Sequence, residues 1–169
     1  TVRSFNFHFN TNALIEPQMK ATSVPKVLGI DGQQKMSKSL DNHIELAATP
    51  EETQKRVMSM VTDPQRVRRT DPGNPDVCNV FSFHKIFSSG EEVAMVNTEC
   101  RRAGIGCVDC KKRMGANLNA SLVDFRARRA EFARDPDAVW DVLRDGAKRA
   151  RAIAEQTMVE VRAAIGLPS

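Results

Sequence analysis

The chain has 169 residues, of which 41% are hydrophobic and 27% are charged, so it can bury a core and intrinsic disorder is excluded as the default. Its formal net charge of +4 favours polyanionic partners without identifying any chemistry. No stretch is long and apolar enough to span a bilayer, and no signal-peptide pattern precedes the first polar residues. We therefore expect a cytoplasmic protein with no membrane partner.

The first 48 residues differ in composition from the rest of the chain. They are rich in Asn, Gln, Pro and Gly and contain one short apolar run at 27–30, which predicts loops around one buried strand. Helix signals dominate from Thr49 onward. Thr49 can cap a helix that begins with Pro50, and we expect this helix to extend over 50–61.

The remainder predicts helices separated by turns. Asp-Pro and Pro-Gly pairs in 62–75 exclude a long element there. Apolar periodicity then predicts a helical hairpin, a long third helix and a last amphipathic helix that begins after Asp135. The predicted helices cover about 76–87, 91–103, 107–134 and 136–165. Aromatic residues at helical spacing, which we expect in the core, are Phe81, Phe83, Phe87, Phe125, Phe132 and Trp140.

A polar loop with two lysines follows the apolar run. Residues 29–39 read Gly-Ile-Asp-Gly-Gln-Gln-Lys-Met-Ser-Lys-Ser, with Lys35 and Lys38 three positions apart. Two ammonium groups at this spacing can reach different oxygens of one triphosphate, while serine hydroxyls and backbone amides donate further hydrogen bonds. The same residue types are also typical of a solvated surface turn.

The five residues from Lys35 to Ser39 resemble the second signature of the class I aminoacyl-tRNA synthetases. Residues 62–75 are similar to the connector that follows this loop in the tryptophanyl members of the class, whereas the tyrosyl members usually differ. The similarity extends from about Val24 to the C-terminus. The chain is therefore identified as resembling the C-terminal part of a bacterial tryptophanyl-tRNA synthetase.

The resemblance implies a fold and an activity. The fold is mainly α: a short α/β remnant of a Rossmann-type catalytic domain at 1–48, followed by a helical anticodon-binding bundle at 49–169. The full-length enzyme would activate tryptophan with ATP and Mg²⁺, transfer it to tRNA(Trp), and act as a homodimer. The first class I signature, a His-Ile-Gly-His-like element, is absent from this sequence. We therefore expect this chain alone to be inactive as a tryptophan–tRNA ligase.

The same resemblance implies roles for single residues. Lys35 and Lys38 would stabilise the transition state of adenylate formation, and Val27 would lie near the adenine. Asp41 stands where glycine is common in relatives, which predicts a stiffer exit from the loop. The implied ATP-binding residues are Val27, Lys35, Met36, Ser37, Lys38 and Ser39.

Four cysteines lie in the middle of the chain. Two residues separate Cys107 from Cys110, six separate Cys100 from Cys107, and twenty-one separate Cys78 from Cys100. A two-residue spacer allows both thiolates to bind one metal centre, and the other two cysteines fall on the two arms of the predicted hairpin. Zinc and a [4Fe–4S] cluster both accept four thiolates. Four buried thiols that pack as small apolar side chains are the remaining alternative.

The resemblance favours the cluster, because a subset of bacterial tryptophanyl-tRNA synthetases holds a [4Fe–4S] cluster beside the anticodon site with a closely similar spacing. That subset has one more residue between its first two ligands. Zn²⁺ stays the alternative. The predicted metal ligands are Cys78, Cys100, Cys107 and Cys110.

Basic residues flank the cysteines in sequence. They could contact phosphates and the unpaired bases of an anticodon loop, although most charged helix faces are merely solvated. The predicted nucleic-acid contacts are Arg101, Arg102, Lys111, Lys112 and Arg113. A stand-alone metal-stabilised RNA-binding module is the alternative to the synthetase, and a helical bundle whose thiolates serve folding alone is a weaker third interpretation.

Overall fold

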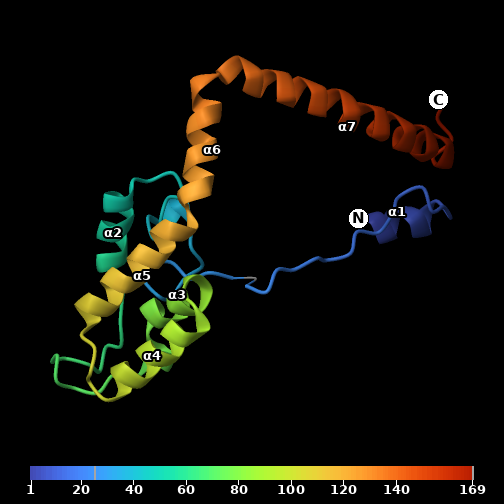
Figure 1. Ribbon diagram of the computed structural model, residues 1–169. Coiled ribbons are helices and arrows are strands. Elements are labelled where there is room, and N and C mark those ends of the chain that lie inside the picture. Colours follow the sequence, from blue (N-terminus) through green and yellow to red (C-terminus); the bar gives the residue numbers. More distant parts are fainter. Residues whose placement is uncertain (25, 169) are drawn as a thin grey trace. The chain divides into compact units, whose positions relative to one another are not determined.

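The computed structural model describes residues 1–24 and 26–168 (Figure 1). Pro25 and Ser169, which fall within the two predicted domains, lie outside the described residues. The described chain is mainly helical, as the sequence predicts. Its helices are α1 (Val2–His8), α2 (Pro50–Met58), α3 (Asn79–Phe87), α4 (Gly90–Arg101), α5 (Cys107–Ser121), α6 (Val123–Arg134) and α7 (Pro136–Ala164), with short 3-10 helices at Lys38–Leu40 and Pro75–Val77.

The predicted strand at 27–30 is wrong. Within the described residues this run forms one isolated antiparallel bridge, between Leu28 and Lys35, because the chain turns back on itself after a few residues. Helix α1 was not predicted, because the polar composition of residues 1–48 indicated loops there.

The chain divides into two compact units, one made of Thr1–Ala21 with Glu131–Ser169 and the other of Thr22–Ala130. The larger unit contains the sites described below. Its core lies where α2 and α3 pack against α5. The predicted boundary between a catalytic domain at 1–48 and a helical domain at 49–169 stays a prediction. The buried apolar residues of this core are Ile44, Val57, Met60, Val80, Phe83, Met114, Leu118 and Leu122.

Local sequence explains where the helices begin. The Thr49 hydroxyl accepts a hydrogen bond from the Glu52 amide, and the Glu52 carboxylate accepts one from the Thr49 amide, so α2 begins with a capping box. The Asp135 carboxylate accepts a hydrogen bond from the Ala138 amide at 3.0 Å, as expected at the start of α7. Both predicted starts are confirmed.

The single helix predicted over 107–134 is interrupted at Leu122. The Ser121 hydroxyl donates to the Leu118 carbonyl at 2.7 Å, and the Leu122 amide bonds to the Asn119 carbonyl instead. A serine hydroxyl that takes a carbonyl of the preceding turn bends or ends a helix. The pattern of apolar residues on either side carries no sign of this break.

The apolar stripe of α7 is not buried. No described residue of α7 is buried, and Trp140 is 57% exposed. Phe125 and Phe132 are also exposed, so the prediction that these three aromatic residues lie in the core is wrong, whereas Phe81 and Phe83 are buried. Periodicity shows that a helix has an apolar face but not what covers it. Among the described residues, no helix has both the length and the apolar content needed to cross a membrane.

Candidate functional site

Residues 27–42, here called the phosphate loop after the role that the sequence predicts for them, form a tight hairpin. The Met36 amide donates to the Val27 carbonyl and the Gly29 amide to the Gln34 carbonyl, both at 2.9 Å. Gly32 has a φ of 66°, a left-handed conformation that favours glycine. The hairpin therefore fixes the backbone on both sides of Lys35.

The Asp31 carboxylate closes the turn of this hairpin. It accepts hydrogen bonds from the amides of Gln33 and Gln34 at 2.9 and 3.3 Å. The Gln33 amide and then the Asn42 side chain favour the charged carboxylate, so the pKa of Asp31 is lowered from its ordinary value.

Asn42 braces the loop from inside. Its side-chain oxygen accepts a hydrogen bond from the Ser37 amide at 2.7 Å, and its side-chain nitrogen donates to Asp31 Oδ2 at 2.8 Å and to the Lys35 carbonyl at 3.4 Å. The Asn42 carbonyl accepts from the Ile30 amide at 2.8 Å, and the residue is 3% exposed. Sequence reasoning missed Asn42, because an asparagine after a polar loop gives no signal of its burial.

The braced backbone presents two cations to solvent. Lys35 and Lys38 are exposed, while Met36 between them is half-buried and packs against the core. Ser37 and Ser39 share a hydroxyl–hydroxyl hydrogen bond of 2.8 Å. Val27 is half-buried and also packs against the core. Such a loop can bind a polyanion with little rearrangement of its backbone.

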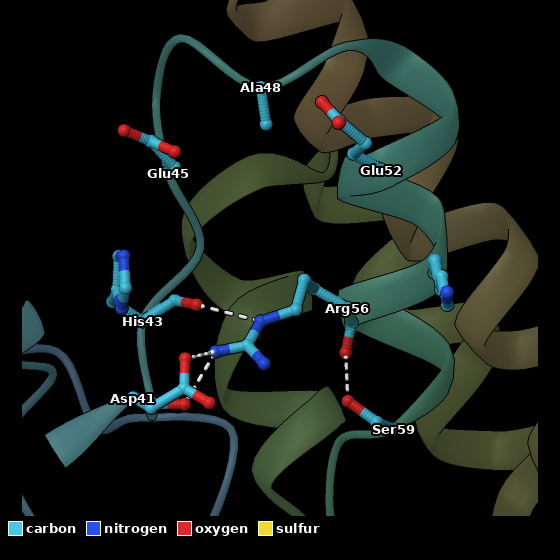
Figure 2. Close-up of a pocket in the computed structure, with 8 residues that line it drawn as sticks. Asp41, His43, Glu45, Ala48, Glu52, Arg56 and Ser59 are labelled. Atoms are coloured by element: carbon cyan, nitrogen blue, oxygen red, sulfur yellow. Dashed lines mark hydrogen bonds and ion pairs between the residues drawn. The ribbon is translucent and has the colours of Figure 1, made fainter.

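A pocket of about 510 Å³ lies beside the exit of the loop. Figure 2 shows Arg56 of α2 reaching across it toward Asp41 and the His43 carbonyl. Asp41 has a φ of 48° and a ψ of 25°, which is the left-handed region. The residues that line the pocket are Asp41, His43, Glu45, Ala48, Glu52, Lys55, Arg56 and Ser59.

The four cysteines line one small cavity elsewhere in the same unit. Cys78 caps α3, Cys100 lies in the last turn of α4, and Cys107 and Cys110 lie in the first turn of α5. The cavity has a volume of about 20 Å³ and is closed by Thr62, Arg66, Val80 and Ile105. No carboxylate or imidazole is among these lining residues.

The residues of the connector pack against this cavity. The Gly73 amide donates to the Cys100 carbonyl at 2.9 Å, and a Cβ atom at Gly73 would lie 2.6 Å from the Cys100 sulfur. Asp63 accepts hydrogen bonds from the amides of Gln65 and Asn74 at 2.9 and 2.7 Å. The Pro- and Gly-rich segment is therefore an ordered wall of the thiol site.

Burial is the main influence on the pKa of three of the four thiols. It raises the pKa of Cys78 and Cys100, and it raises the pKa of Cys110 to about 12. Arg66 Nη1 lies 3.9 Å from the Cys100 sulfur and 3.8 Å from the Cys107 sulfur, and its charge partly opposes the raised pKa of Cys100. Arg66 Nη2 donates to the carbonyls of Arg69 and Ile105, both at 2.9 Å.

Convergence of the cysteines is not by itself a metal site. In the part of the chain that the structure describes, no three or more Cys, His, Asp or Glu side chains are arranged to hold a metal ion. The chemistry of the donors nevertheless fits a centre that takes four thiolates, because four sulfur atoms and no oxygen ligand of a carboxylate line one cavity. Metal binding there would displace protons from the thiols.

The predicted nucleic-acid residues lie around this region, and four of them already have partners within the chain. Arg101 pairs with Asp76 at 2.6 Å, and Lys111 donates to the Met58 carbonyl at 2.9 Å. The other paired residues are Arg102, with Glu99, and Arg113, with Glu92. Lys112 is exposed.

Sequence reasoning missed two further arginines. Arg68 and Arg69 are exposed and line a pocket of about 320 Å³ next to Cys107. Arg69 donates to the carbonyls of Ala103 and Gly104, at 2.5 and 3.0 Å. In the sequence these two arginines precede Cys78, whereas the predicted nucleic-acid contacts all follow Cys100, so the sequence did not indicate that the two groups lie near the same site.

Comparison with known proteins assigns the family. The family described as tRNA synthetases class I (W and Y) matches residues 2–123 of the chain. The chain belongs to this family. It is 42% identical over 154 residues to a tryptophan–tRNA ligase from Aquifex aeolicus, which covers 90% of this chain and 39% of that protein. It is 42% identical over 166 residues to the ligase from Thermotoga maritima, covering 98% of this chain and 50% of that protein.

Solved synthetases of the family share the fold. The crystal structure of tryptophanyl-tRNA synthetase from Campylobacter jejuni complexed with ADP and tryptophan matches with a TM-score of 0.77 and 26% identity. The match covers 98% of this chain and 51% of that chain. This class I synthetase chain thus spans about half the length, or less, of the curated relatives it matches.

Proposed function

We propose that this chain is the part of a tryptophan–tRNA ligase that supplies the ATP-phosphate loop and contacts tRNA(Trp). The observation that carries the proposal is the pair of exposed lysines, Lys35 and Lys38, on a loop whose backbone is fixed by Asn42. The naming of several relatives as tryptophan–tRNA ligases supports it. The cytoplasmic location and the homodimer of the complete enzyme belong to the same proposal.

In this function the two ammonium groups neutralise the triphosphate as tryptophan attacks the α-phosphorus and pyrophosphate leaves. Stabilisation grows as negative charge builds on the leaving group, so the lysines lower the barrier more than they strengthen ground-state binding. Ser37, Ser39 and backbone amides of the loop donate hydrogen bonds to phosphate oxygens, and Val27 contributes an apolar contact to the adenine. Mg²⁺ bound to ATP supplies further charge neutralisation.

The test uses the full-length enzyme, because the chain alone lacks the first class I signature. Lys35→Ala and Lys38→Ala should each lower the rate of tryptophan-dependent pyrophosphate exchange by about 10²-fold or more, with little change in tryptophan affinity. Lys26→Ala, an exposed lysine close to the loop, is the matched control. Normal exchange in both loop variants would end the proposal.

We further propose that Cys78, Cys100, Cys107 and Cys110 hold a [4Fe–4S] cluster. Four thiols line one cavity without a carboxylate ligand, and the spacing resembles that of the cluster-containing subset of the family. When bound, the cluster supplies a fixed, charged centre that links the ends of α3, α4 and α5. The cysteines would bind it as thiolates, and Arg66 would balance part of their negative charge.

Anaerobic purification tests this centre. Iron and sulfide at about four atoms each per chain, with broad visible absorption that Cys107→Ser abolishes, are the expected results. Thr62→Val, in the wall of the same cavity, is the control that should keep the colour. Stoichiometric zinc without iron would overturn the cluster, and thiols that carry neither metal would overturn any metal centre.

For tRNA binding, we propose that the predicted cations act together with Arg68 and Arg69. Exposed ion pairs such as Arg101 with Asp76 contribute little to stability, so these arginines can exchange a carboxylate for a phosphate. Lys112→Ala or Arg68→Ala should weaken tRNA binding and reduce the salt dependence of the affinity by about one charge each. Arg144→Ala on α7 is the control, and equal losses in all three variants would contradict a localised interface.

A further inference from the structure

Arg56 joins the exit of the phosphate loop to helix α2. Its Nε atom donates to the His43 carbonyl at 3.1 Å, and Nη2 donates both to the Asp41 carbonyl and to Asp41 Oδ1, the latter at 2.9 Å (Figure 2). Two of these three hydrogen bonds end on backbone carbonyls. A side chain that binds backbone atoms fixes the path of the loop itself, which an ordinary exposed ion pair does not do.

Two of these hydrogen bonds are made to Asp41, whose backbone conformation is unfavourable for a residue other than glycine. Asp41 is in the left-handed region, which costs free energy for residues other than glycine. Its amide donates to the Lys38 carbonyl at 3.2 Å. A movement of Asp41 therefore changes the position of Lys38, one of the two cations that the loop presents.

The helix that carries Arg56 is firmly held. Val57, the next residue, is fully buried in the core. Lys111 of α5 donates to the Met58 carbonyl at 2.9 Å, and Gln54 of α2 donates to the Lys111 carbonyl at 3.4 Å. Arg56 thus ties the exit of the loop to α2, which is itself held against α5.

We propose that Arg56 is a positioning residue that holds the exit of the phosphate loop, and with it Lys38, in the place required for ATP. The proposal deepens the function assigned above and rests on it for its catalytic consequence. Arg56 does not touch substrate in this role. It acts through Asp41 and His43.

The structural part is tested on the 169-residue chain by amide hydrogen exchange. Arg56→Gln should speed exchange of the hydrogen-bonded amides of Ser37 and Asp41 by about tenfold, the loss expected when a charged donor leaves its acceptors. Arg56→Lys should give a smaller increase, because an ammonium keeps the charge without the guanidinium fork. Lys55→Gln, the preceding residue on the same pocket wall, is the matched control and should change neither amide. Unchanged exchange in Arg56→Gln would overturn the proposal.

The catalytic part is tested in the full-length enzyme. Arg56→Gln should lower kcat for pyrophosphate exchange by about tenfold and leave the KM for tryptophan unchanged, with partial recovery in Arg56→Lys. An equal loss of folding stability and of tryptophan binding would instead indicate a general structural role and overturn the proposal. If the lysine variants lose exchange activity while Arg56→Gln keeps it, the positioning role fails alone. If neither set changes activity, the proposed function fails.

Discussion

The phosphate loop and the four-cysteine cavity satisfy their polar groups in different ways. In the loop, Asp31 and Asn42 bind each other and the surrounding amides. In the cavity, Arg66 Nε is buried and has no hydrogen-bond partner among the described residues, and burial raises the pKa of Cys110 to about 12. The loop is therefore shaped by the chain itself, whereas the proposed metal centre would change the charge balance of the cavity, because its thiols would lose protons on binding.

The largest expected effect in this comparison comes from removing the brace of the loop. Asn42→Ala leaves the Ser37 amide and the Lys35 carbonyl without their side-chain partner, at a position that is only 3% exposed. We expect the free energy of unfolding to fall by about 2–4 kcal/mol, because unpaired buried groups keep their full desolvation cost. Urea denaturation followed by circular dichroism measures this change.

Gln33→Ala is the control for the brace, because the Gln33 side chain is exposed in the same loop. Its effect should stay within about 0.5 kcal/mol. A loss in Asn42→Ala no larger than in Gln33→Ala would show that backbone hydrogen bonds alone shape the loop.

At the cavity, the corresponding change is smaller. Arg66→Lys keeps a positive charge but cannot bind both carbonyls and both sulfurs at once. We expect the free energy of unfolding of the metal-free chain to fall by about 1–3 kcal/mol, since two hydrogen bonds from a charged donor are weakened. Urea denaturation under reducing conditions checks this value.

Arg68→Lys serves as the matched control for the cavity, because Arg68 is exposed two residues away. If the four thiols hold a metal as proposed, metal retention should depend on Arg66 and not on Asn42. Equal metal content in the Arg66→Lys and native proteins would mean that the four thiols hold the centre without help from this cation.

The sequence predicted those features that short segments determine. The N-cap at Thr49 and the Asp135-Pro136 start of α7 could be predicted because each helix cap involves residues within one turn. The arrangement of the four cysteines around one cavity also follows from helix starts and ends, since Cys78 precedes α3 and Cys107 and Cys110 open α5. Their metal-binding role stays a prediction.

The residues that sequence reasoning missed act over longer separations. Arg56 reaches back to Asp41, and Arg66 reaches forward to Cys100 and Cys107. Nothing in the local pattern distinguishes such an arginine from the many that are solvated. Trp140 illustrates the converse error, because its apolar stripe predicted burial and the residue is 57% exposed.

The smallest expected effect concerns the pH dependence of the loop. Because the pKa of Asp31 is lowered in the folded chain, its carboxylate stabilises the fold above the ordinary carboxyl pKa of 3.8, and this contribution is lost as the pH falls through the lower folded value.

Asp31→Asn removes this pH dependence. It also places an amide NH₂ group next to the Asn42 side-chain nitrogen, where an acceptor is needed. The amides of Gln33 and Gln34 should therefore gain protection from exchange as the pH rises through the lowered pKa of Asp31, below 3.8, in the native chain, after correction for intrinsic rates. In Asp31→Asn their protection should stay low at every pH. Asp124→Asn, on exposed α6, should follow the native profile. A native profile without a step would mean that Asn42 and the hairpin backbone hold the turn whether or not Asp31 is charged, which would strengthen the contrast with the cavity.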